Sequence, residues 1–443
     1  MLPLNIVFAM IELLKEMILD AQAGSLYVGT PRHLKPAYVK NKATIIIGVR
    51  RSGKSTLLSQ IADKWLSEGV LRENILYINF FDDRLSKLQT LGLDIVMQSY
   101  YSLYPHKKTQ ETTYCFFDEL QIIPDWEAFI DRILRTENVV VYISGSSAQM
   151  LSKEIATQMR GRALSWELFP FSFKEYADHM KIERNLPLNT QQRLFIENAF
   201  QNYWDCGGFP EIAGLEKSLR IKVHQEYFES ILFRDLIERY DISHPRALVD
   251  LAKHMLENIA SMYTVNSMTG FLKSLGYSVP KSSVSEYLNW FEDAYFLFTV
   301  RLYDASFRRS NANPKKIYCV DHALIRSVSS GILTNSGHIL ENIIFMAIRR
   351  LTSDIFYYKT KSNMEVDFVF KNTEGKLILM QVCESLINPK TRQREINALE
   401  AAMAELKVTY GFIITRNDSE SLVIESGTIE ILPVWKALLL NNF

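Results

Sequence analysis

Short apolar runs alternate with longer amphipathic stretches between residues 43 and 168 of this chain. The runs fall at residues 43–47, 75–80, 114–117, 139–143 and 164–168. Near-continuous apolar runs of this kind are typical of a parallel sheet that helices cover on both faces. The pattern therefore predicts a three-layer α/β domain whose ligand site lies at the carboxyl ends of the strands.

The hydrophobic pattern changes twice after this region. Residues 171–240 read as mostly helical with a break at 206–210, and three further helical patterns follow between residues 245 and 290. Two strands, near 295–302 and 317–320, are joined by a polar loop and suit the wing of a winged-helix unit. The pattern predicts an N-terminal helical extension (1–34), an α/β domain (35–175), a helical lid or linker (176–244), a winged-helix-like domain (245–330) and a C-terminal α/β domain (331–443).

The chain starts with an apolar stretch that we interpret as an amphipathic helix. Acidic and basic residues interrupt it at helical spacing and no basic residues precede it, so a signal peptide is not expected. No later stretch reaches about 18 uncharged apolar residues, so we expect no membrane span. The cysteines form no Cys-x-x-Cys pair, which favours reduced thiols and a cytoplasmic protein.

Charge excludes one simple interpretation. Lys plus Arg and Asp plus Glu number 50 each, so no global positive field indicates a nucleic-acid partner. Any such partner must be held by a local patch.

One glycine pattern indicates a specific chemistry. Residues 48–55 read Gly-x-x-x-x-Gly-Lys-Ser, between the strand at 43–47 and a helical pattern. Gly48 and Gly53 allow the loop to wrap tightly, so that backbone N–H groups and a helix N-terminus converge on a phosphate. Lys54 would neutralise the β- and γ-phosphates, and Ser55 would complete the shell of Mg²⁺. We therefore expect ATP and Mg²⁺ as ligands. The other loop contacts are expected from Arg50, Arg51, Ser52 and Thr56.

A second strand carries the residues that hydrolysis requires. The run at 114–117 ends in two adjacent carboxylates, Asp118 and Glu119. Asp118 would hold Mg²⁺ through water, and Glu119 would polarise the attacking water as a general base. The next run ends near Ser144 and Ser146, either of which could bind the γ-phosphate or the lytic water. An ordinary strand-to-helix cap is the alternative for these serines.

Arginines near the last strand are candidates for stabilising the transition state. Arg160 and Arg162 precede the run at 164–168, and arginine is suited to spreading the charge on a transferring phosphoryl group, in cis or from a neighbouring subunit. Arg50 and Arg51 are rivals for this role. At each position a solvated or structural arginine is an equally open alternative.

Several motifs occur in an order that resembles one protein family. They are GVRRSGKST (48–56), INFFDDRL (78–85), FFDELQ (116–121), SGSSAQML (144–151), the segment from RGR to PFSFKEY (160–176), CGGFPE (206–211) and FRDLIERYDI (233–242). From about residue 36 the chain resembles the uncharacterised bacterial and archaeal AAA-type ATPases that pair a P-loop domain with a C-terminal domain of unknown function. The resemblance implies an AAA+-like ATPase core, a winged-helix segment and a restriction-endonuclease-like C-terminal domain.

The loop between the two wing strands holds a local group of cations. Arg308, Arg309, Lys315 and Lys316 lie in a stretch without an acidic residue. Such a loop could follow a DNA backbone, although the presumed reading helix near residues 281–291 has an exposed face that is only weakly basic. DNA contact and a role in protein packing both stay open.

The nuclease-like domain departs from the catalytic pattern that the resemblance implies. Glu341, Glu365, Asp367, Gln381 and Cys383 are spaced like the core of restriction-endonuclease-like enzymes. Such a site uses clustered carboxylates for Mg²⁺ and a lysine that helps to generate the hydroxide nucleophile. Cys383 stands where the lysine is expected and Gln381 replaces the usual acid. We therefore expect a degenerate site that serves binding or oligomerisation.

The main hypothesis is a cytoplasmic, Mg²⁺-dependent ATPase whose nucleotide cycle moves the winged-helix and C-terminal domains. DNA and further copies of the chain are the partners it allows. One alternative is a slow ATP-dependent switch in signalling or defence, with little turnover. The other alternative is an ATP-gated DNA nuclease.

Overall fold

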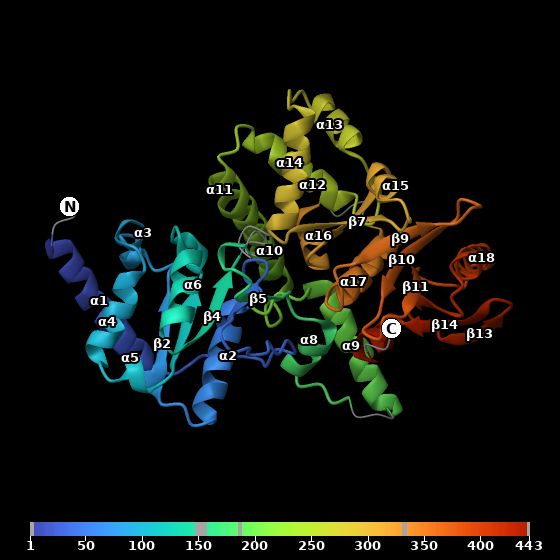
Figure 1. Ribbon diagram of the computed structural model, residues 1–443. Helices are drawn as coiled ribbons and strands as arrows, with labels where there is room; N and C mark the ends of the chain where they lie inside the picture. The colour runs from blue at the N-terminus through green and yellow to red at the C-terminus, as the bar shows by residue number, and fades with distance from the viewer. Residues whose placement is uncertain (1–3, 147–156, 185–187, 330–334, 441–443) are drawn as a thin grey trace. The chain divides into compact units, whose positions relative to one another are not determined.

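The computed structural model describes residues 4–146, 157–184, 188–329 and 335–440 of the 443-residue chain (Figure 1). Its internal contacts divide the chain into two compact units, Met1–Leu168 and Phe169–Phe443, and each unit has its own sheet. Within the described ranges, no helix is long and apolar enough to cross a lipid bilayer.

The first unit is built on a five-stranded parallel sheet, as the apolar runs predict. Its strands are β1 (Ala43–Ile47), β2 (Ile75–Asn79), β3 (Thr113–Asp118), β4 (Val139–Gly145) and β5 (Ala163–Glu167). The order across the sheet is β2-β3-β4-β1-β5. Because every pair is parallel, the carboxyl ends of all these strands meet at one edge.

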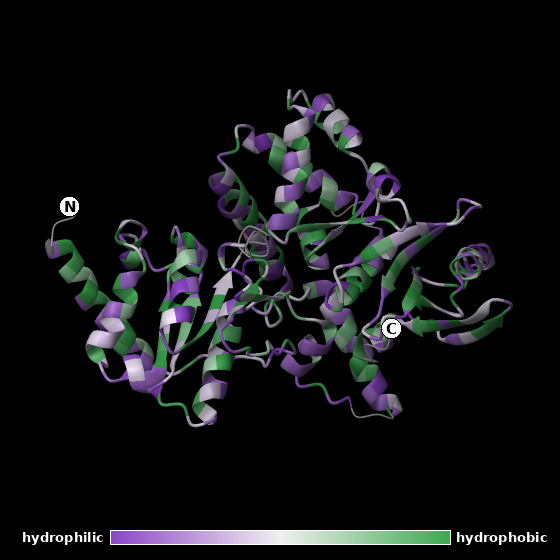
Figure 2. Cartoon of the chain, in the orientation of Figure 1, coloured by the Kyte–Doolittle hydropathy of each residue, from purple (hydrophilic) through white to green (hydrophobic). Residues whose placement is uncertain are grey.

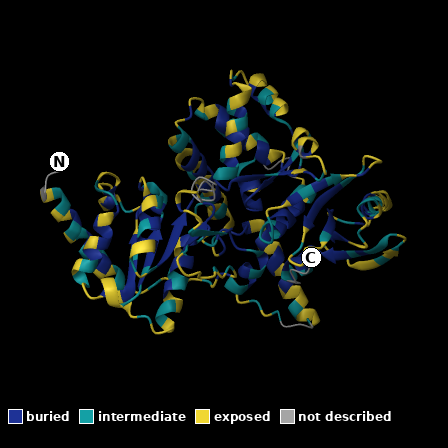
Figure 3. Cartoon of the chain, in the orientation of Figure 1, coloured by how far each residue is buried: buried dark blue, intermediate teal, exposed yellow. Residues whose placement is uncertain are grey.

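Helices cover both faces of this sheet, and its strands are mostly green in Figure 2 and dark blue in Figure 3. On β3, Phe116 packs in a buried cluster with Leu57 of α2 (Lys54–Ser67). The next residue, Phe117, lies 6.2 Å, ring to ring, from Phe129 of α6 (Trp126–Thr136). Because successive strand residues point to opposite faces, α2 and α6 lie on opposite sides of the sheet.

The N-terminal stretch forms the helix α1 (Leu4–Ala23), which packs on β2 and on α4 (Asp94–Leu103). Met10, Leu14 and Ile18 recur every fourth residue and are buried, as an amphipathic helix requires. The short helices of this unit are η1 (Arg72–Asn74), η2 (Asp83–Leu85), α3 (Leu88–Leu91), α5 (Lys107–Gln110) and η3 (Leu120–Ile122).

The second unit contains a mixed sheet of nine strands. They are β6 (Met262–Tyr263), β7 (Leu297–Leu302), β8 (Lys315–Cys319), β9 (Ile355–Lys359), β10 (Glu365–Lys371), β11 (Leu377–Val382), β12 (Tyr410–Thr415), β13 (Glu420–Ile424) and β14 (Gly427–Pro433). The order is β13-β14-β12-β11-β10-β9-β7-β8-β6. β7 pairs in parallel with β9, so strands from both sides of the expected boundary at residue 330 belong to one sheet.

The helices of the second unit follow the predicted order. They are α8 (Phe173–His179), α9 (Thr190–Cys206), α10 (Lys217–Ser230), the π-helix η5 (Ile231–Ile237), α11 (Glu238–Tyr240), α12 (Pro245–Glu257), α13 (Val265–Ser274), α14 (Lys281–Asp293), α15 (Phe307–Ala312), α16 (His322–Val328), α17 (Ser336–Arg349), α18 (Pro389–Leu406) and α19 (Val434–Leu440). The stretch between β7 and β8 is not simply a polar loop, because it contains α15.

The paired glycines at the end of α9 permit a close approach of three segments. Gly208 accepts a hydrogen bond from the backbone N–H of Phe171 (2.6 Å) and donates its own N–H to Asp321 (2.6 Å). A Cβ atom at Gly208 would lie 2.3 Å from the carbonyl oxygen of Phe171. Gly207 has a φ of 75°, which favours glycine. The positive φ at Gly207 and the close backbone approach at Gly208 explain why the helical region breaks here.

We predict that Gly208→Ala destabilises the second unit by about 1–3 kcal/mol, because the new methyl group would force the backbone of Phe171 away. Gly214→Ala is the matched control, since a Cβ atom there meets nothing within 4 Å. Urea unfolding followed by circular dichroism measures both variants. Equal midpoints for the two variants would contradict the close-approach explanation.

Candidate functional site

The loop between β1 and α2 lies at the carboxyl edge of the five-stranded sheet. Gly48 and Gly53 have φ angles of 153° and 96°, a region that favours glycine. A Cβ atom at Gly48 would lie 2.1 Å from the carbonyl oxygen of Leu168, so a larger residue does not fit. The loop thus turns directly into the N-terminus of α2, whose first N–H groups have no intrahelical acceptor and can bind an anion.

The first residue of α2, Lys54, lies inside this loop and is 5 % exposed. Its Nζ donates to the carbonyl oxygens of Gly48 (3.1 Å) and Val49 (3.2 Å). The same ammonium group lies 3.8 Å from Oε1 of Glu119. A buried ammonium at a helix N-terminus is suited to phosphate oxygens, which form strong charge-assisted hydrogen bonds.

Ser144, at the end of β4, connects the two carboxylates at the end of β3. Its hydroxyl group donates to Asp118 and accepts a hydrogen bond from the backbone N–H of Glu119 (3.0 Å). Asp118 also accepts from the hydroxyl group of Tyr77 on β2 (3.3 Å) and hydrogen-bonds with Ser55 of α2. Burial raises the pKa of Asp118, while the hydrogen bond from Ser144 opposes that rise. Three neighbouring elements therefore fix the position of this carboxylate.

Glu119 adopts a left-handed backbone conformation, with a φ of 56°. Such a conformation is uncommon for a residue other than glycine and persists where the surroundings impose it. Here the hydrogen bond from its N–H to Ser144 holds the backbone, and Gln121 donates to its Oε2 (2.6 Å). The side chain keeps 18 % exposure and lies beside Lys54, where it can meet solvent and a bound phosphate.

Two serine hydroxyl groups at this site have no hydrogen-bond partner among the described residues. Ser52 in the loop is fully buried, and Ser146 after β4 is 1 % exposed. Buried polar atoms without a partner are rare, and each of these would gain one from a bound oxyanion. The rest of the motif after Ser146 lies outside the described residues.

The donor set at Ser55 and Asp118 fits a magnesium ion. Mg²⁺ prefers oxygen ligands and is usually held by one or two protein groups together with substrate phosphates. A hydroxyl group and a carboxylate that already contact each other at the mouth of a phosphate-binding loop satisfy that requirement. No cluster of three or more metal-ligating side chains occurs in the described parts of the chain.

The loop itself carries Arg50 and Arg51. The guanidinium group of Arg50 lies 5.6 Å from the ring centre of Phe81, which follows β2. Arg51 is exposed and has a φ of 67°. Both arginines, the alternative candidates for stabilising the transition state, therefore lie in the phosphate loop. Thr56 follows Ser55 on the first turn of α2.

Arg160 and Arg162 lie at the opposite edge of the sheet. They precede β5, whose first residue, Ala163, is paired with Ala43 at the start of β1. Five residues of extended strand separate them from the phosphate loop by about 15 Å, and Arg162 is held by an ion pair with Asp131 (2.7 Å). This placement corrects the expectation that either arginine acts in cis. Action from a neighbouring subunit stays a prediction.

Arg32 and Gln60 belong to the site but were missed from the sequence. Arg32 is 2 % exposed and donates through Nη1 to the carbonyl oxygen of Ser52 (2.6 Å), so it supports the backbone of the phosphate loop. Gln60 of α2 accepts from the N–H of Arg32 (3.1 Å) and donates to the carbonyl oxygens of Val28 (2.5 Å) and Thr30 (2.7 Å). These bonds fasten the segment before β1 to the helix that follows the loop.

A second cluster of charges lies in the nine-stranded sheet, and Lys316 is at its centre. Its Nζ lies 2.9 Å from Glu341 and 2.8 Å from each of Glu365 and Asp367. Lys316 is 3 % exposed and its ammonium group is surrounded by carboxylates, so of the two alternatives left open for it the structure favours packing over contact with DNA. Lys316 lies on β8, far from these three carboxylates in the sequence.

The remaining residues of the nuclease-like pattern surround this cluster. Gln381 accepts from the N–H of Asp367 (3.2 Å) and donates to Glu395 (2.6 Å). Burial raises the pKa of the Cys383 thiol to about 12, so Cys383 is a neutral thiol near neutral pH. Burial, and then repulsion by Asp367, raise the pKa of Glu341 to about 7. Glu341, Glu365, Asp367 and Gln381 therefore do come together, around a cation that the pattern did not include.

The other cations of the expected wing differ in exposure. Arg308 and Arg309 are exposed on α15, and Arg309 forms an ion pair with Asp304 (3.3 Å). Lys315, at the start of β8, is half-buried, and burial lowers its pKa. Arg308, Arg309 and Lys315 remain candidates for contact with DNA.

The phosphate loop and the adjacent carboxylates define a P-loop protein of the AAA class. Residues 40–177 match the family model described as an AAA domain, which implies nucleotide binding. Residues 197–334 and 336–436 match two domains of unknown function, DUF8612 and DUF4143.

The chain belongs to the family of the uncharacterized protein MJ1544 of Methanocaldococcus jannaschii. The two sequences are 31 % identical over 416 residues, which cover 91 % of this chain and 90 % of that protein. The resemblance to AAA-type ATPases with a C-terminal domain of unknown function is thereby confirmed at the level of the family. None of these matches describes the C-terminal domain as nuclease-like or the middle domain as a winged helix.

Two solved structures are similar to this chain at much lower sequence identity. The Walker-type ATPase PABY2304 of Pyrococcus abyssi has 15 % identity and a TM-score of 0.41, over 65 % of this chain and 90 % of that one. The Orc1 protein of Aeropyrum pernix, solved in complex with DNA, has 14 % identity and a TM-score of 0.30, over 75 % of this chain and 94 % of that one. Such low TM-scores say nothing about a shared ligand or partner.

We predict that Lys316→Met destabilises the second unit by about 3–5 kcal/mol, because it leaves buried carboxylates without their cation. Adding Glu341→Gln and Asp367→Asn to that variant should restore part of the loss, since the two buried carboxylates are replaced by neutral amides. Lys376→Met is the control, because Lys376 pairs with Glu374 at the surface. Urea unfolding measures all three variants. A Lys316→Met chain as stable as the control would contradict the assignment.

We predict a second effect of this cluster in the pH dependence of stability. The folded-state pKa of Glu341, raised to about 7, lies above its ordinary value of 4.5. The folded chain therefore binds this proton more tightly than the unfolded chain does. Protonated Glu341 contributes to the free energy of unfolding below about pH 4.5, and this contribution is lost as the pH rises from about 4.5 through 7. Glu341→Gln lacks this loss, so its stability relative to the wild type should rise by about 1–3 kcal/mol between pH 5 and pH 8.

Glu374→Gln is the comparison for this pH series. The pKa of Glu374 is lowered by its hydrogen bond with Lys376, so its contribution has the opposite sign. If the free energies of unfolding of Glu341→Gln and the wild type change with pH in parallel between pH 5 and pH 8, a raised pKa of Glu341 is excluded.

Proposed function

We propose that the first unit is a Mg²⁺-dependent ATPase. The observation that supports this most is the geometry at the edge of the sheet. Glu119, fixed in a left-handed conformation by Ser144, lies 3.8 Å from Lys54, which occupies the phosphate loop. A residue suited to act as a base and a phosphate-binding cation are therefore adjacent.

Binding would begin at the loop. The β- and γ-phosphates would accept hydrogen bonds from the N–H groups of the loop and of α2, and the Lys54 ammonium group would exchange loop carbonyls for phosphate oxygens. Ser52 and Ser146 would gain partners for their buried hydroxyl groups. Arg32 would keep the loop in shape by holding the carbonyl oxygen of Ser52.

Ser55 and Asp118 would hold the magnesium ion. When bound, Mg²⁺ would supply positive charge that offsets the charge developing on the transferring phosphoryl group. Glu119 would orient a water molecule and accept its proton while the water oxygen forms a bond to the γ-phosphorus. The bond from that phosphorus to the bridging oxygen breaks, and ADP leaves with the electron pair. Ser144 would keep both carboxylates in place.

The proposed hydrolysis would move the second unit. The expected winged-helix and C-terminal segments share one sheet through β7 and β9, so they would move as one body. Arg308, Arg309 and Lys315 are the described cations by which that body could contact DNA. Strong stimulation of turnover by DNA supports this role, whereas negligible turnover with ATP-dependent assembly supports the slow switch.

Nuclease activity is not part of the proposal. The restriction-endonuclease-like site needs its carboxylates for metal ions. In this chain the Lys316 ammonium group lies between Glu341, Glu365 and Asp367 and occupies the position where these carboxylates meet. The arrangement supports a role of this cluster in holding the sheet together.

We predict that Glu119→Gln lowers the rate of ATP hydrolysis by about 10²–10⁴-fold, the usual contribution of a general base, and leaves ATP affinity nearly unchanged. The amide keeps the shape and the contact with Gln121 but cannot accept the proton. Phosphate release and the binding of a fluorescent ATP analogue measure the two effects. Glu68→Gln, at the exposed end of α2, is the control. Unchanged turnover in Glu119→Gln would remove this residue from the role.

A further inference from the structure

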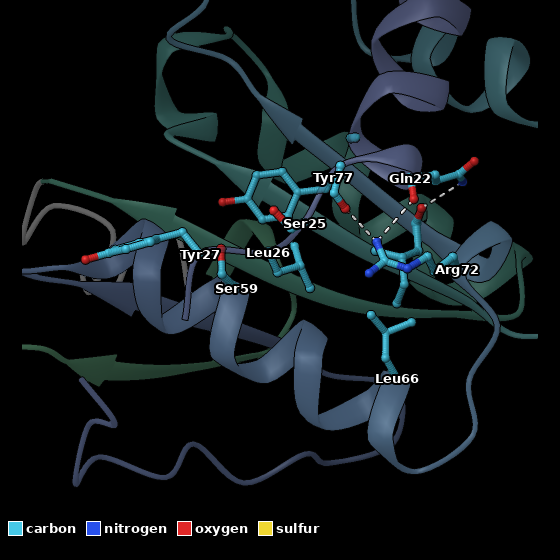
Figure 4. Close-up of a pocket in the computed structure, with 11 residues that line it drawn as sticks. Gln22, Ser25, Leu26, Tyr27, Ser59, Leu66, Arg72 and Tyr77 are labelled. Atoms are coloured by element: carbon cyan, nitrogen blue, oxygen red, sulfur yellow. Dashed lines mark hydrogen bonds between the residues drawn. The ribbon is translucent and has the colours of Figure 1, made fainter. Parts of the chain in front are cut away.

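A cavity of about 260 Å³ lies in the first unit, beside the phosphate site and separate from it (Figure 4). It is lined by the end of α1, the segment at residues 24–27, the middle and end of α2, and the start of β2, and it is partly open to solvent. All of these belong to the same compact unit. None of the roles proposed above uses this cavity.

The walls of the cavity are mainly apolar, with one cation. Leu66 and Ile75 line it together with the rings of Tyr27 and Tyr77, and Figure 4 shows these tyrosines and Leu66 around the same space. Arg72 is the only charged residue among those that line it, and no carboxylate does. Such walls favour a ligand with an apolar body and one negative charge.

The position of Arg72 is fixed. Its Nη1 donates to the carbonyl oxygens of Gln22 (3.2 Å) and Gly24 (2.7 Å), as the dashed lines in Figure 4 show. Gln22 in turn donates to the carbonyl oxygen of Ile75 (3.0 Å). The guanidinium group is therefore anchored at the cavity and needs little ordering to bind an anion, and a fixed guanidinium fork suits a carboxylate.

The volume indicates the size of the ligand. An apolar cavity of about 150 Å³ holds one benzene molecule. A cavity of 260 Å³ therefore accommodates a bicyclic aromatic body or an aliphatic body of similar size, with its carboxylate at Arg72.

Two of the residues that line the cavity are connected to the phosphate site. The hydroxyl group of Tyr77 donates to Asp118 (3.3 Å), the carboxylate that would hold Mg²⁺. Ser59 lies on α2, the helix that starts with Lys54. A ligand that packs against the Tyr77 ring therefore contacts the residue that helps to position Asp118.

We propose that this cavity is an effector site for a small aromatic or aliphatic carboxylate, and that its occupant changes nucleotide affinity through Tyr77. The second part rests on the proposed function, whereas the first part does not. Coupling between two sites is reciprocal, so it is measurable as a change in the affinity of either ligand.

The test uses 2-naphthoate as the probe and the full chain, with binding measured by isothermal titration calorimetry. We expect a dissociation constant between about 20 µM and 1 mM, given the size of the probe. The neutral 2-naphthamide should bind at least about fivefold more weakly. Leu66→Trp, which fills the cavity, should abolish binding, whereas Leu71→Trp, at a 60 % exposed leucine, should not.

A second substitution tests the site independently if the Leu66→Trp variant does not fold. Arg72→Gln should weaken 2-naphthoate by about fivefold and leave 2-naphthamide unchanged. The exposed Arg84→Gln is its control. No binding of 2-naphthoate to the wild type, or equal binding to the Leu66→Trp and Leu71→Trp variants, would overturn the site.

Coupling is tested by repeating the titration with ADP and Mg²⁺ present. We expect the affinity for 2-naphthoate to change by at least about fivefold, and Tyr77→Phe to remove most of that change while the probe still binds. Unchanged affinity on a chain that binds ADP overturns the coupling. A chain that binds 2-naphthoate but no nucleotide contradicts the proposed function and leaves the effector site standing.

Discussion

The hydrogen bonds of Ser144 are the constraint on which the candidate active site depends. Its hydroxyl group lies between strands β3 and β4, donates to the carboxylate of Asp118 and accepts from the N–H of Glu119. The second bond stabilises a left-handed conformation that a glutamate otherwise avoids. Without it, Glu119 would lose the orientation that brings its side chain beside Lys54. The parallel sheet brings the ends of β3 and β4 to one edge, and the hydroxyl group of Ser144 fixes the positions of Asp118 and Glu119 at that edge.

Features that depend on a local pattern of residues could be predicted from the sequence. The apolar runs predict the five parallel strands, because buried strands need apolar residues on both faces. The glycine loop and the pair Asp118 and Glu119 were also predictable, since strand direction alone places them at one edge. Strand direction also contradicts the cis role of Arg160 and Arg162, because residues that precede a strand lie at its opposite end.

Contacts between residues far apart in the chain were not predictable. Arg32 reaches the phosphate loop from a segment with no motif, through a bond to a backbone oxygen that any residue could supply. Lys316 was placed in an exposed loop because its neighbours are cationic and polar. Its actual environment consists of carboxylates from α17 and β10, which the packing of α17 on β8 and the pairing of strands across residue 330 bring together. That pairing also places strands from both sides of the expected boundary at residue 330 in one sheet.

The central claim is that chemistry takes place at the phosphate loop. Release of inorganic phosphate from ATP by the full chain, with and without Mg²⁺, tests it most directly when the wild type is compared with Lys54→Ala. The account predicts Mg²⁺-dependent release by the wild type and loss of both ATP binding and release in the variant, since Lys54 is the buried cation of the loop. Equal phosphate release by the two chains would contradict it.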